Sequence, residues 1–155
     1  MVHTLISQVS QTILANVGFP WAFHTGRDAI GEIVPGMAVT SIAMTADTYN
    51  CELPDLANDI AAGVACRNPE HDIDTAYTQW DEFEVALTGG GHLVWGHLHN
   101  SVGNKFGSKL SVTVAGAGTV TDITEANVIE QFAIKWNETA STAAVQPCQM
   151  ILIPG

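Results

Sequence analysis

Basic side chains are scarce in this sequence. Five Lys and Arg residues stand against 16 Asp and Glu residues, which gives a formal net charge of −11 at pH 7. Proteins that bind nucleic acids use clustered Lys and Arg to neutralise phosphate groups, so the composition argues against a nucleic-acid partner. The negative charge favours solubility and repulsion between copies, and it is compatible with a partner that has a basic surface.

Cysteine is also scarce, and the hydrophobic runs are short. The three cysteines, Cys51, Cys66 and Cys148, form no CxxC motif, and their odd number leaves at least one free thiol. We therefore expect buried, reduced thiols and no disulfide framework. No apolar run approaches the roughly 20 residues that cross a membrane, and the N-terminus lacks the charged and apolar blocks of a signal peptide. The sequence predicts a soluble protein without a membrane partner, made in a reducing compartment.

The sequence is rich in the alternation of apolar and polar residues that is typical of β-strands. Residues 82–99 show it most clearly, because Phe83, Val85 and Leu87 point to one face and the intervening residues to the other. Three glycines at positions 89–91 provide a turn, and a second β-rich run follows. We predict a β-hairpin with a three- or four-residue loop.

Short β-rich runs with glycine turns between them make up much of the remaining chain. Gly63 lies inside one of these runs, which indicates a close approach of two backbones or a bulge. The spacing predicts an all-β fold, an antiparallel β-barrel or sandwich. We expect residues 24–155 to form a single domain behind an N-terminal arm at residues 1–23. The other predicted strands lie within residues 37–45, 48–53, 60–66, 110–115, 119–123, 128–136 and 148–153.

The N-terminal segment permits two interpretations. Leu5, Val9 and Ile13 recur every four residues after a threonine that can act as a cap, so residues 4–17 fit a short amphipathic helix. The β-branched residues of the segment disfavour a helix, and an extended arm on a neighbouring subunit has a similar composition. Both interpretations stay open, and a Gly-Phe-Pro break at residues 18–20 ends either structure.

His97 and His99 are the candidate metal ligands. Their spacing from Gly91 resembles the opening of the first cupin motif, and residues i and i+2 of a strand share a face, so both imidazoles can reach one ion. The cupin pattern then needs a Glu shortly afterwards and a distant His, and neither follows His99. His92 lies on the opposite face of a regular strand. We predict no metal and no other cofactor, and a cupin-like metal-binding β-barrel enzyme is the alternative.

An acidic run precedes and enters the strand predicted at residues 82–87. Calcium sites need oxygen ligands at set spacing and a glycine at the sharp turn, and this run lacks both, so a solvated charged loop is the better interpretation. The chain has no GxSxG motif and no cysteine in an activating context. We therefore predict no catalytic residue and no enzymatic activity. The acidic residues are Glu70, Asp72, Asp74, Asp81, Glu82 and Glu84.

A series of strand and turn motifs runs through most of the chain, from about residue 17 to residue 153. The motifs occupy residues 17–20 (VGFP), 33–39 (IVPGMAV), 62–65 (AGVA), 77, 83–87, 91–98, 106–110, 116–120, 128–136 and 149–153. In this serial order they resemble the head decoration proteins, or capsid cement proteins, of tailed bacteriophages. The chain departs from the family pattern at Ser108, where an aspartate often follows the glycine of the turn.

The resemblance implies an all-β structural virion protein that is made in the host cytoplasm, forms a homotrimer and binds the outer capsid surface. Its partners are then the major capsid protein and copies of itself, and it cements the contacts between capsomers. Another β-rich virion subunit, from a tail or a fibre, is an alternative. Residues 2–23 are apolar and uncharged, so we expect them to order on the capsid, and we expect their deletion to abolish binding without unfolding the domain. The candidate interface residues are Leu5, Val9, Ile13, Phe19, Pro20, Trp21 and Phe23.

Overall fold

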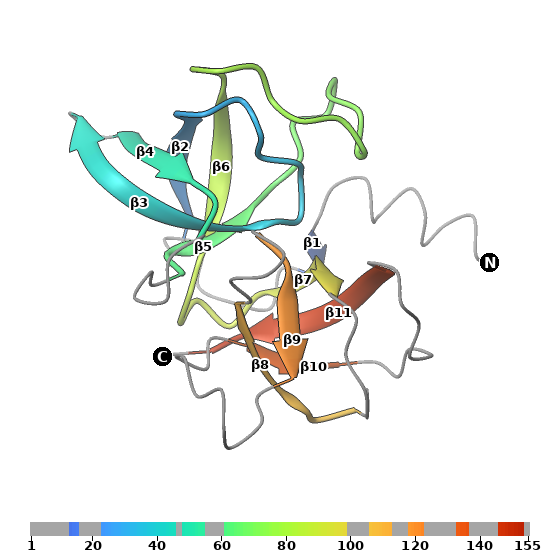
Figure 1. Ribbon diagram of the computed structural model, residues 1–155. Helices are drawn as coiled ribbons and strands as arrows, with labels where there is room; N and C mark the ends of the chain where they lie inside the picture. The colour runs from blue at the N-terminus through green and yellow to red at the C-terminus, as the bar shows by residue number, and fades with distance from the viewer. Residues whose placement is uncertain are drawn as a thin grey trace.

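The computed structural model describes residues 13–15, 23–45, 48–54, 61–98, 106–112, 118–122, 133–136 and 146–153. These ranges form strands, turns and loops, and none of them contains a helix, so none contains a helix that could span a membrane. The all-β prediction is confirmed (Figure 1). The strands are β1 (Ile13–Ala15), β2 (Phe23–Asp28), β3 (Ala38–Thr45), β4 (Thr48–Glu52), β5 (Gly63–Ala65), β6 (Glu82–Leu87), β7 (Leu93–Leu98), β8 (Lys109–Val112), β9 (Val120–Asp122), β10 (Ala133–Lys135) and β11 (Gln146–Leu152).

Five strands close into a barrel in the order β2-β4-β3-β5-β6, and β6 pairs back with β2. The β2–β4 pair is parallel, and the other neighbouring pairs are antiparallel. Figure 1 shows this barrel in blue to green above the remaining strands. The barrel is therefore built from the first half of the chain.

A second sheet has the order β1-β7-β11-β10-β8-β9. Its longest pairing joins β7 to β11 in antiparallel register, from Leu93↔Ile151 to Leu98↔Gln146. One parallel bridge, Leu98↔Val120, also joins β9 to β7, so the sheet turns back on itself.

Strand β1 tests the helical interpretation for part of the N-terminal segment. Ile13 pairs with Val94 of β7 in the same chain, so residues Ile13–Ala15 are extended and the helical interpretation is wrong for them. The other residues of the 4–17 segment lie outside the described ranges. Phe23, the last residue assigned to the arm, is the first residue of β2.

The predicted hairpin at residues 82–99 is wrong, although both of its strands form. β6 pairs with β2 and β5 inside the barrel, whereas β7 pairs with β1, β11 and β9 in the second sheet. Gly89 and Gly91 do adopt the positive φ that was expected, 84° and 74°. The turn carries the chain from one sheet to the other, because the Gly91 N–H and His92 C=O bond to Leu152 of β11 instead of continuing the β6 ladder.

Three barrel strands each carry buried residues on both faces, and these residues join the two sheets into one structure. Within β6, Val85 belongs to a cluster with other barrel residues, whereas its neighbour Ala86 belongs to a cluster that includes Val94 and Leu152 of the second sheet. The same division separates Val39 from Ala38 in β3 and Ala65 from Val64 in β5. Alternate residues of a strand point to opposite faces, so these strands supply both the barrel interior and the contact between sheets.

Two glycines mark places where the barrel strands pack most closely. A Cβ atom on Gly63 would lie 2.2 Å from the carbonyl oxygen of Ala86, which confirms the predicted close approach of two backbones. A Cβ atom on Gly26 would lie 2.6 Å from a methyl group of Val85. Gly26 is part of β2, which the sequence pattern did not predict, because the glycine in its middle weakens the strand signal.

Candidate functional site

The loop between β5 and β6 carries most of the acidic residues singled out in the sequence. In Figure 1 this loop runs in green along the top of the barrel. All six carboxylate residues of the acidic run are exposed, which confirms the predicted solvated, charged loop. They are Glu70, Asp72, Asp74, Asp81, Glu82 and Glu84.

Tyr77 anchors this exposed loop to the barrel, and its side chain is only 1% exposed. Its hydroxyl group donates a 2.7 Å hydrogen bond to the carbonyl oxygen of Cys66 and accepts a 2.9 Å bond from the N–H of Asn68. The ring stacks against Phe83 and His71, with centroid distances of 4.8 and 4.2 Å. Burial raises the pKa of Tyr77 to about 12. The loop is polar on its exposed side, and the buried Tyr77 side chain holds it against the barrel.

Asp28, at the end of β2, organises the loop that follows it. This residue is completely buried, and its carboxylate accepts hydrogen bonds from the N–H groups of Ile30, Gly31 and Ile33 at 2.9, 2.6 and 3.0 Å. Buried carboxylates require such donors to offset their lost hydration. Asp28 therefore holds residues 28–33 in one conformation.

The Asp28 loop and the acidic loop meet at Trp80. The N–H of Trp80 donates a 2.6 Å hydrogen bond to the Asp28 carbonyl oxygen, and the Asp28 N–H bonds to the carbonyl oxygen of Asp81. Thr78 and Asp81 close the turn around it through two further bonds of 2.9 Å. Trp80 is held at a φ of 76°, a left-handed conformation that costs a residue with a Cβ about 1–2 kcal/mol. The two loops thus force one aromatic residue into a conformation that it disfavours.

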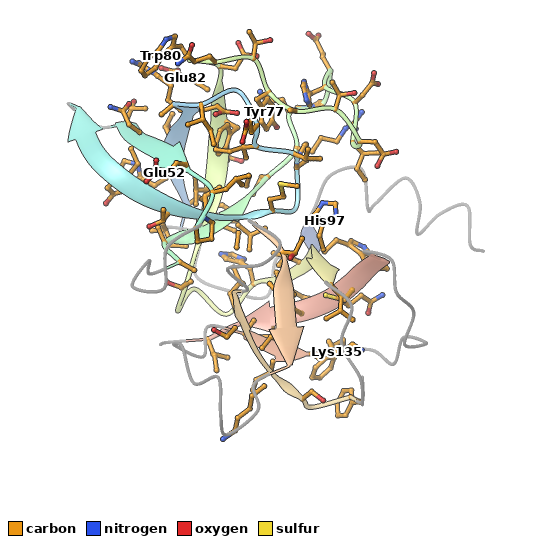
Figure 2. The ribbon with its side chains drawn as sticks, in the orientation of Figure 1. Glu52, Tyr77, Trp80, Glu82, His97 and Lys135 are labelled. Carbon is orange, nitrogen blue, oxygen red and sulfur yellow. The ribbon has the colours of Figure 1, made fainter. Side chains whose placement is uncertain are left out.

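Trp80 is nevertheless solvent-exposed, to 55%, and Ile30 on the adjoining loop is 39% exposed. Trp80 and Glu82 lie close together at the end of the barrel (Figure 2). An exposed aromatic and an exposed aliphatic side chain therefore lie on two loops that are hydrogen-bonded to each other, and two acidic residues follow the aromatic one in the chain. We call Ile30, Trp80, Asp81 and Glu82 the Trp80 surface.

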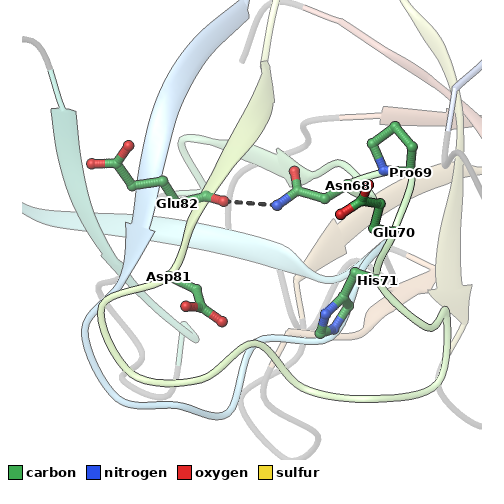
Figure 3. A pocket seen from close by; sticks show the side chains of 6 residues that line it. All are labelled: Asn68, Pro69, Glu70, His71, Asp81 and Glu82. Atoms are coloured by element: carbon green, nitrogen blue, oxygen red, sulfur yellow. Dashed lines mark hydrogen bonds between the residues drawn. The ribbon is translucent and has the colours of Figure 1, made fainter.

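A hollow of about 480 Å³ adjoins the Trp80 surface (Figure 3). Three carboxylate residues contribute to its wall, and Asn68 bridges it by donating a 2.9 Å hydrogen bond to the carbonyl oxygen of Glu82. Arg27 pairs with the Glu82 carboxylate at 3.0 Å on the outside of β2. The Glu82 carboxylate points away from the hollow (Figure 3), which leaves Glu70 and Asp81 as its acidic side chains. The hollow is open and favours positively charged groups. Its lining residues are Asn68, Pro69, Glu70, His71, Asp81 and Glu82.

A second exposed surface lies beside the other sheet and consists of two aromatic residues, one before β8 and one after β10. Phe106 and Trp136 are 58% and 44% exposed, and their ring centroids are 5.0 Å apart. Hydrogen bonds of 2.8 Å between Lys135 and its neighbours Gly107 and Ser108 hold the two segments together. We call Phe106 and Trp136 the Phe106 surface.

Of the two candidate metal ligands, only His97 lies within the described residues. Its Nε2 atom is 2.8 Å from the carbonyl oxygen of Pro35, which can only accept, so this nitrogen carries a proton and donates. His92 is completely buried on the opposite face, as predicted, with its ring 4.3 Å from that of Phe23. The described residues contain no group of three or more His, Cys, Asp or Glu side chains that could hold a metal ion. His97 also belongs to β7, outside the five-stranded barrel.

The three cysteines are free and buried, as predicted. Burial raises the pKa of the Cys51 thiol to about 11 and that of Cys66 to about 12. Nucleophilic cysteines need a lowered pKa and access to solvent. Cys51 and Cys66 are therefore suited to packing and unsuited to nucleophilic chemistry.

Most of the predicted interface residues lie outside the described ranges: Leu5, Val9, Phe19, Pro20 and Trp21. Ile13 is in β1, and Phe23 is half-buried against the core between the two sheets. Their role at an interface stays a prediction.

Sequence reasoning missed Trp80 and Ile30 as a surface. The signal available in the sequence was a tryptophan in a polar, acidic stretch.

No protein-family model matches this chain, and no curated protein matches its sequence.

Proposed function

We propose that this chain is a structural virion protein that binds the outer capsid surface and cements the contacts between capsomers. The observation that carries the proposal is the presence of two separate exposed surfaces with aromatic side chains, one beside the barrel and one beside the second sheet. A subunit that joins neighbouring bodies needs at least two contact surfaces, and aromatic side chains supply much of the binding energy at protein interfaces. The Trp80 surface and the Phe106 surface meet this need.

The charge of the chain supports the same proposal. A particle that is covered by subunits with a net charge of −11 is kept apart from other particles by repulsion. The partners we propose are the major capsid protein and other copies of the chain, assembled as a homotrimer on the outer capsid surface.

The N-terminal arm is the proposed first contact with the capsid, and the fold defines how it can be tested. Deletion of residues 2–23 removes β1, which pairs with β7, and Phe23, which packs on the core. A deletion of residues 2–12 leaves both in place. This shorter deletion therefore tests the arm's role in capsid binding without removing residues that stabilise the fold.

The experiment uses capsids of the virus that encodes the chain, assembled without it. The intact protein is expected to co-sediment with these capsids and to raise the temperature at which they release DNA. The protein without residues 2–12 is expected to lose both effects while keeping its melting temperature. In the control, residues 2–12 are replaced by an equal length of Gly and Ser, and this variant is expected to behave like the deletion. If the intact protein does not bind these capsids, the proposal is wrong.

A further inference from the structure

We propose that the Trp80 surface is a docking site for a basic protein segment, one that presents Arg or Lys side chains and belongs to a partner other than a second copy of this chain. The inference rests on the proposed function only in that a capsid is then the expected source of the segment. The docking itself is argued from the described residues and is tested without capsids.

More than half of the Trp80 side chain faces solvent, although its backbone is strained. Its side chain is 55% exposed, and its backbone has a φ of 76°. Hydrogen bonds from two loops enforce this conformation, and Gly or Asn would adopt it with less strain. Strained residues that the surrounding structure enforces occur most often at binding sites. Tryptophan is also the side chain most enriched among the residues that dominate interface energies.

The side chains around Trp80 carry a net negative charge. Asp81 and Glu82 follow it in the chain, and Glu70 completes the acidic wall of the adjoining hollow. Two arginines lie nearby. Arg27 is paired with Glu82, so these two charges offset each other, and Arg67 donates to the carbonyl oxygen of His71 and keeps its positive charge. The exposed carboxylates of the loop, Glu70, Asp72, Asp74 and Asp81, outnumber Arg67, so the surface that remains for a partner is negative and complements a positive one.

An arginine side chain is the positively charged group that fits this surface best. An arginine guanidinium stacks on the face of an exposed tryptophan and forms paired hydrogen bonds with carboxylates. Trp80 is followed in the chain by Asp81, which lines the hollow, so two adjacent residues offer the two kinds of contact.

A second copy of this chain is disfavoured as the occupant. The chain has only five basic residues, of which Arg27 is already paired and Lys135 is completely buried. Two acidic Trp80 surfaces brought together would repel each other, whatever contacts the copies form elsewhere. The complementary surface is therefore sought on another protein.

The test titrates the intact protein with the synthetic peptide Ac-GRGRGRG-NH2 at low salt and follows tryptophan fluorescence and binding heat. We expect saturable binding that weakens when salt is raised to physiological strength. The matching peptide Ac-GEGEGEG-NH2 is expected not to bind. If the arginine peptide does not bind, or if both peptides bind equally, the proposal is wrong.

Single substitutions test whether the arginine peptide binds at the Trp80 surface. Trp80→Gly, which suits the positive φ, is expected to weaken arginine-peptide binding about tenfold or more, and Trp80→Asn serves if the glycine variant unfolds. Glu70→Gln is expected to weaken binding about threefold, because it removes one carboxylate from the hollow. The controls are Trp136→Ala on the Phe106 surface and Glu84→Gln on β6 outside the hollow, and neither is expected to change binding. Equal losses in the controls overturn the proposal.

Light scattering on the same variants tests whether a second copy of this chain occupies the Trp80 surface instead. If Trp80→Gly lowers the native mass of the protein, the surface is a contact between copies and the proposal is wrong. The peptide result also separates this inference from the proposed function. If the protein binds the arginine peptide but not capsids, the proposed capsid role is wrong and the docking site stands. If it binds capsids but not the peptide, the docking site is wrong and the capsid role stands.

Discussion

The hydroxyl group of Tyr77 donates a 2.7 Å hydrogen bond to the carbonyl oxygen of Cys66, and this bond connects the acidic loop to the end of β5. The Tyr77 hydroxyl oxygen also accepts a hydrogen bond from the N–H of Asn68, so one buried phenol satisfies two backbone groups. The order of the loop and the position of the acidic hollow depend on this connection.

Replacing Tyr77 by Phe should lower the free energy of unfolding by about 1–3 kcal/mol, because it leaves a buried carbonyl and a buried N–H without their partner. Urea denaturation followed by fluorescence measures the change. Tyr49→Phe is the matched control at the other tyrosine, which is only half-buried, and a change within about 0.5 kcal/mol is expected there. Equal effects at the two positions contradict the anchoring role of Tyr77.

Asp28→Asn tests the buried carboxylate that organises the Trp80 surface. An amide accepts hydrogen bonds at only one end, so at least one of the N–H groups of Ile30, Gly31 and Ile33 loses its acceptor. We expect a loss of about 2–3 kcal/mol in the free energy of unfolding, measured by urea denaturation. The control is Asp74→Asn on the exposed loop, for which no measurable loss is expected.

Gly63→Ala tests the close approach of β5 and β6. The added Cβ would lie 2.2 Å from the carbonyl oxygen of Ala86, a backbone atom that cannot move without disturbing the barrel. A loss of about 3 kcal/mol or more is expected in thermal and urea unfolding. Gly107→Ala separates this steric effect from a conformational one. Gly107 has a φ of 85° but no atom near the added methyl group, so a cost of only about 1–2 kcal/mol is expected.

The buried thiols predict a loss of stability at alkaline pH. Burial raises the pKa of Cys51 from 9.0 to about 11, and that of Cys66 from 9.0 to about 12. Above pH 9 the unfolded chain releases these protons while the folded chain retains them. The free energy of unfolding should therefore be constant with respect to these groups below pH 9 and fall as the pH rises through 11 and 12.

Urea denaturation in a reducing buffer at several pH values between 7.5 and 11 measures this dependence. The variant Cys66→Ala should show a shallower fall than the intact protein, because one of the titrating groups is gone. The same slope in both proteins would show that Cys66 does not contribute.

The local pattern of the sequence was sufficient for several features. Phe83 and Val85 alternate with exposed glutamates, and this alternation placed β6 and its buried face correctly. The acidic residues are exposed because isolated charges lose too much hydration when buried. The cysteines are buried because their side chains are small and apolar in the reduced form. β2 was missed, because the glycine that the barrel interior requires at position 26 weakens the strand signal.

The sequence by itself determined where many of the strands lie, which face of β6 is buried and which loop carries the charge. These are properties of neighbouring residues. Only the tertiary structure decided that β6 and β7 enter different sheets, because side-chain alternation specifies a buried face and leaves the hydrogen-bonding partner of each edge open. It alone also decided that Trp80 is exposed, since the hydrogen bond from Trp80 to Asp28 joins residues that are distant in the sequence. Long-range hydrogen bonds of this kind leave no local pattern in the chain.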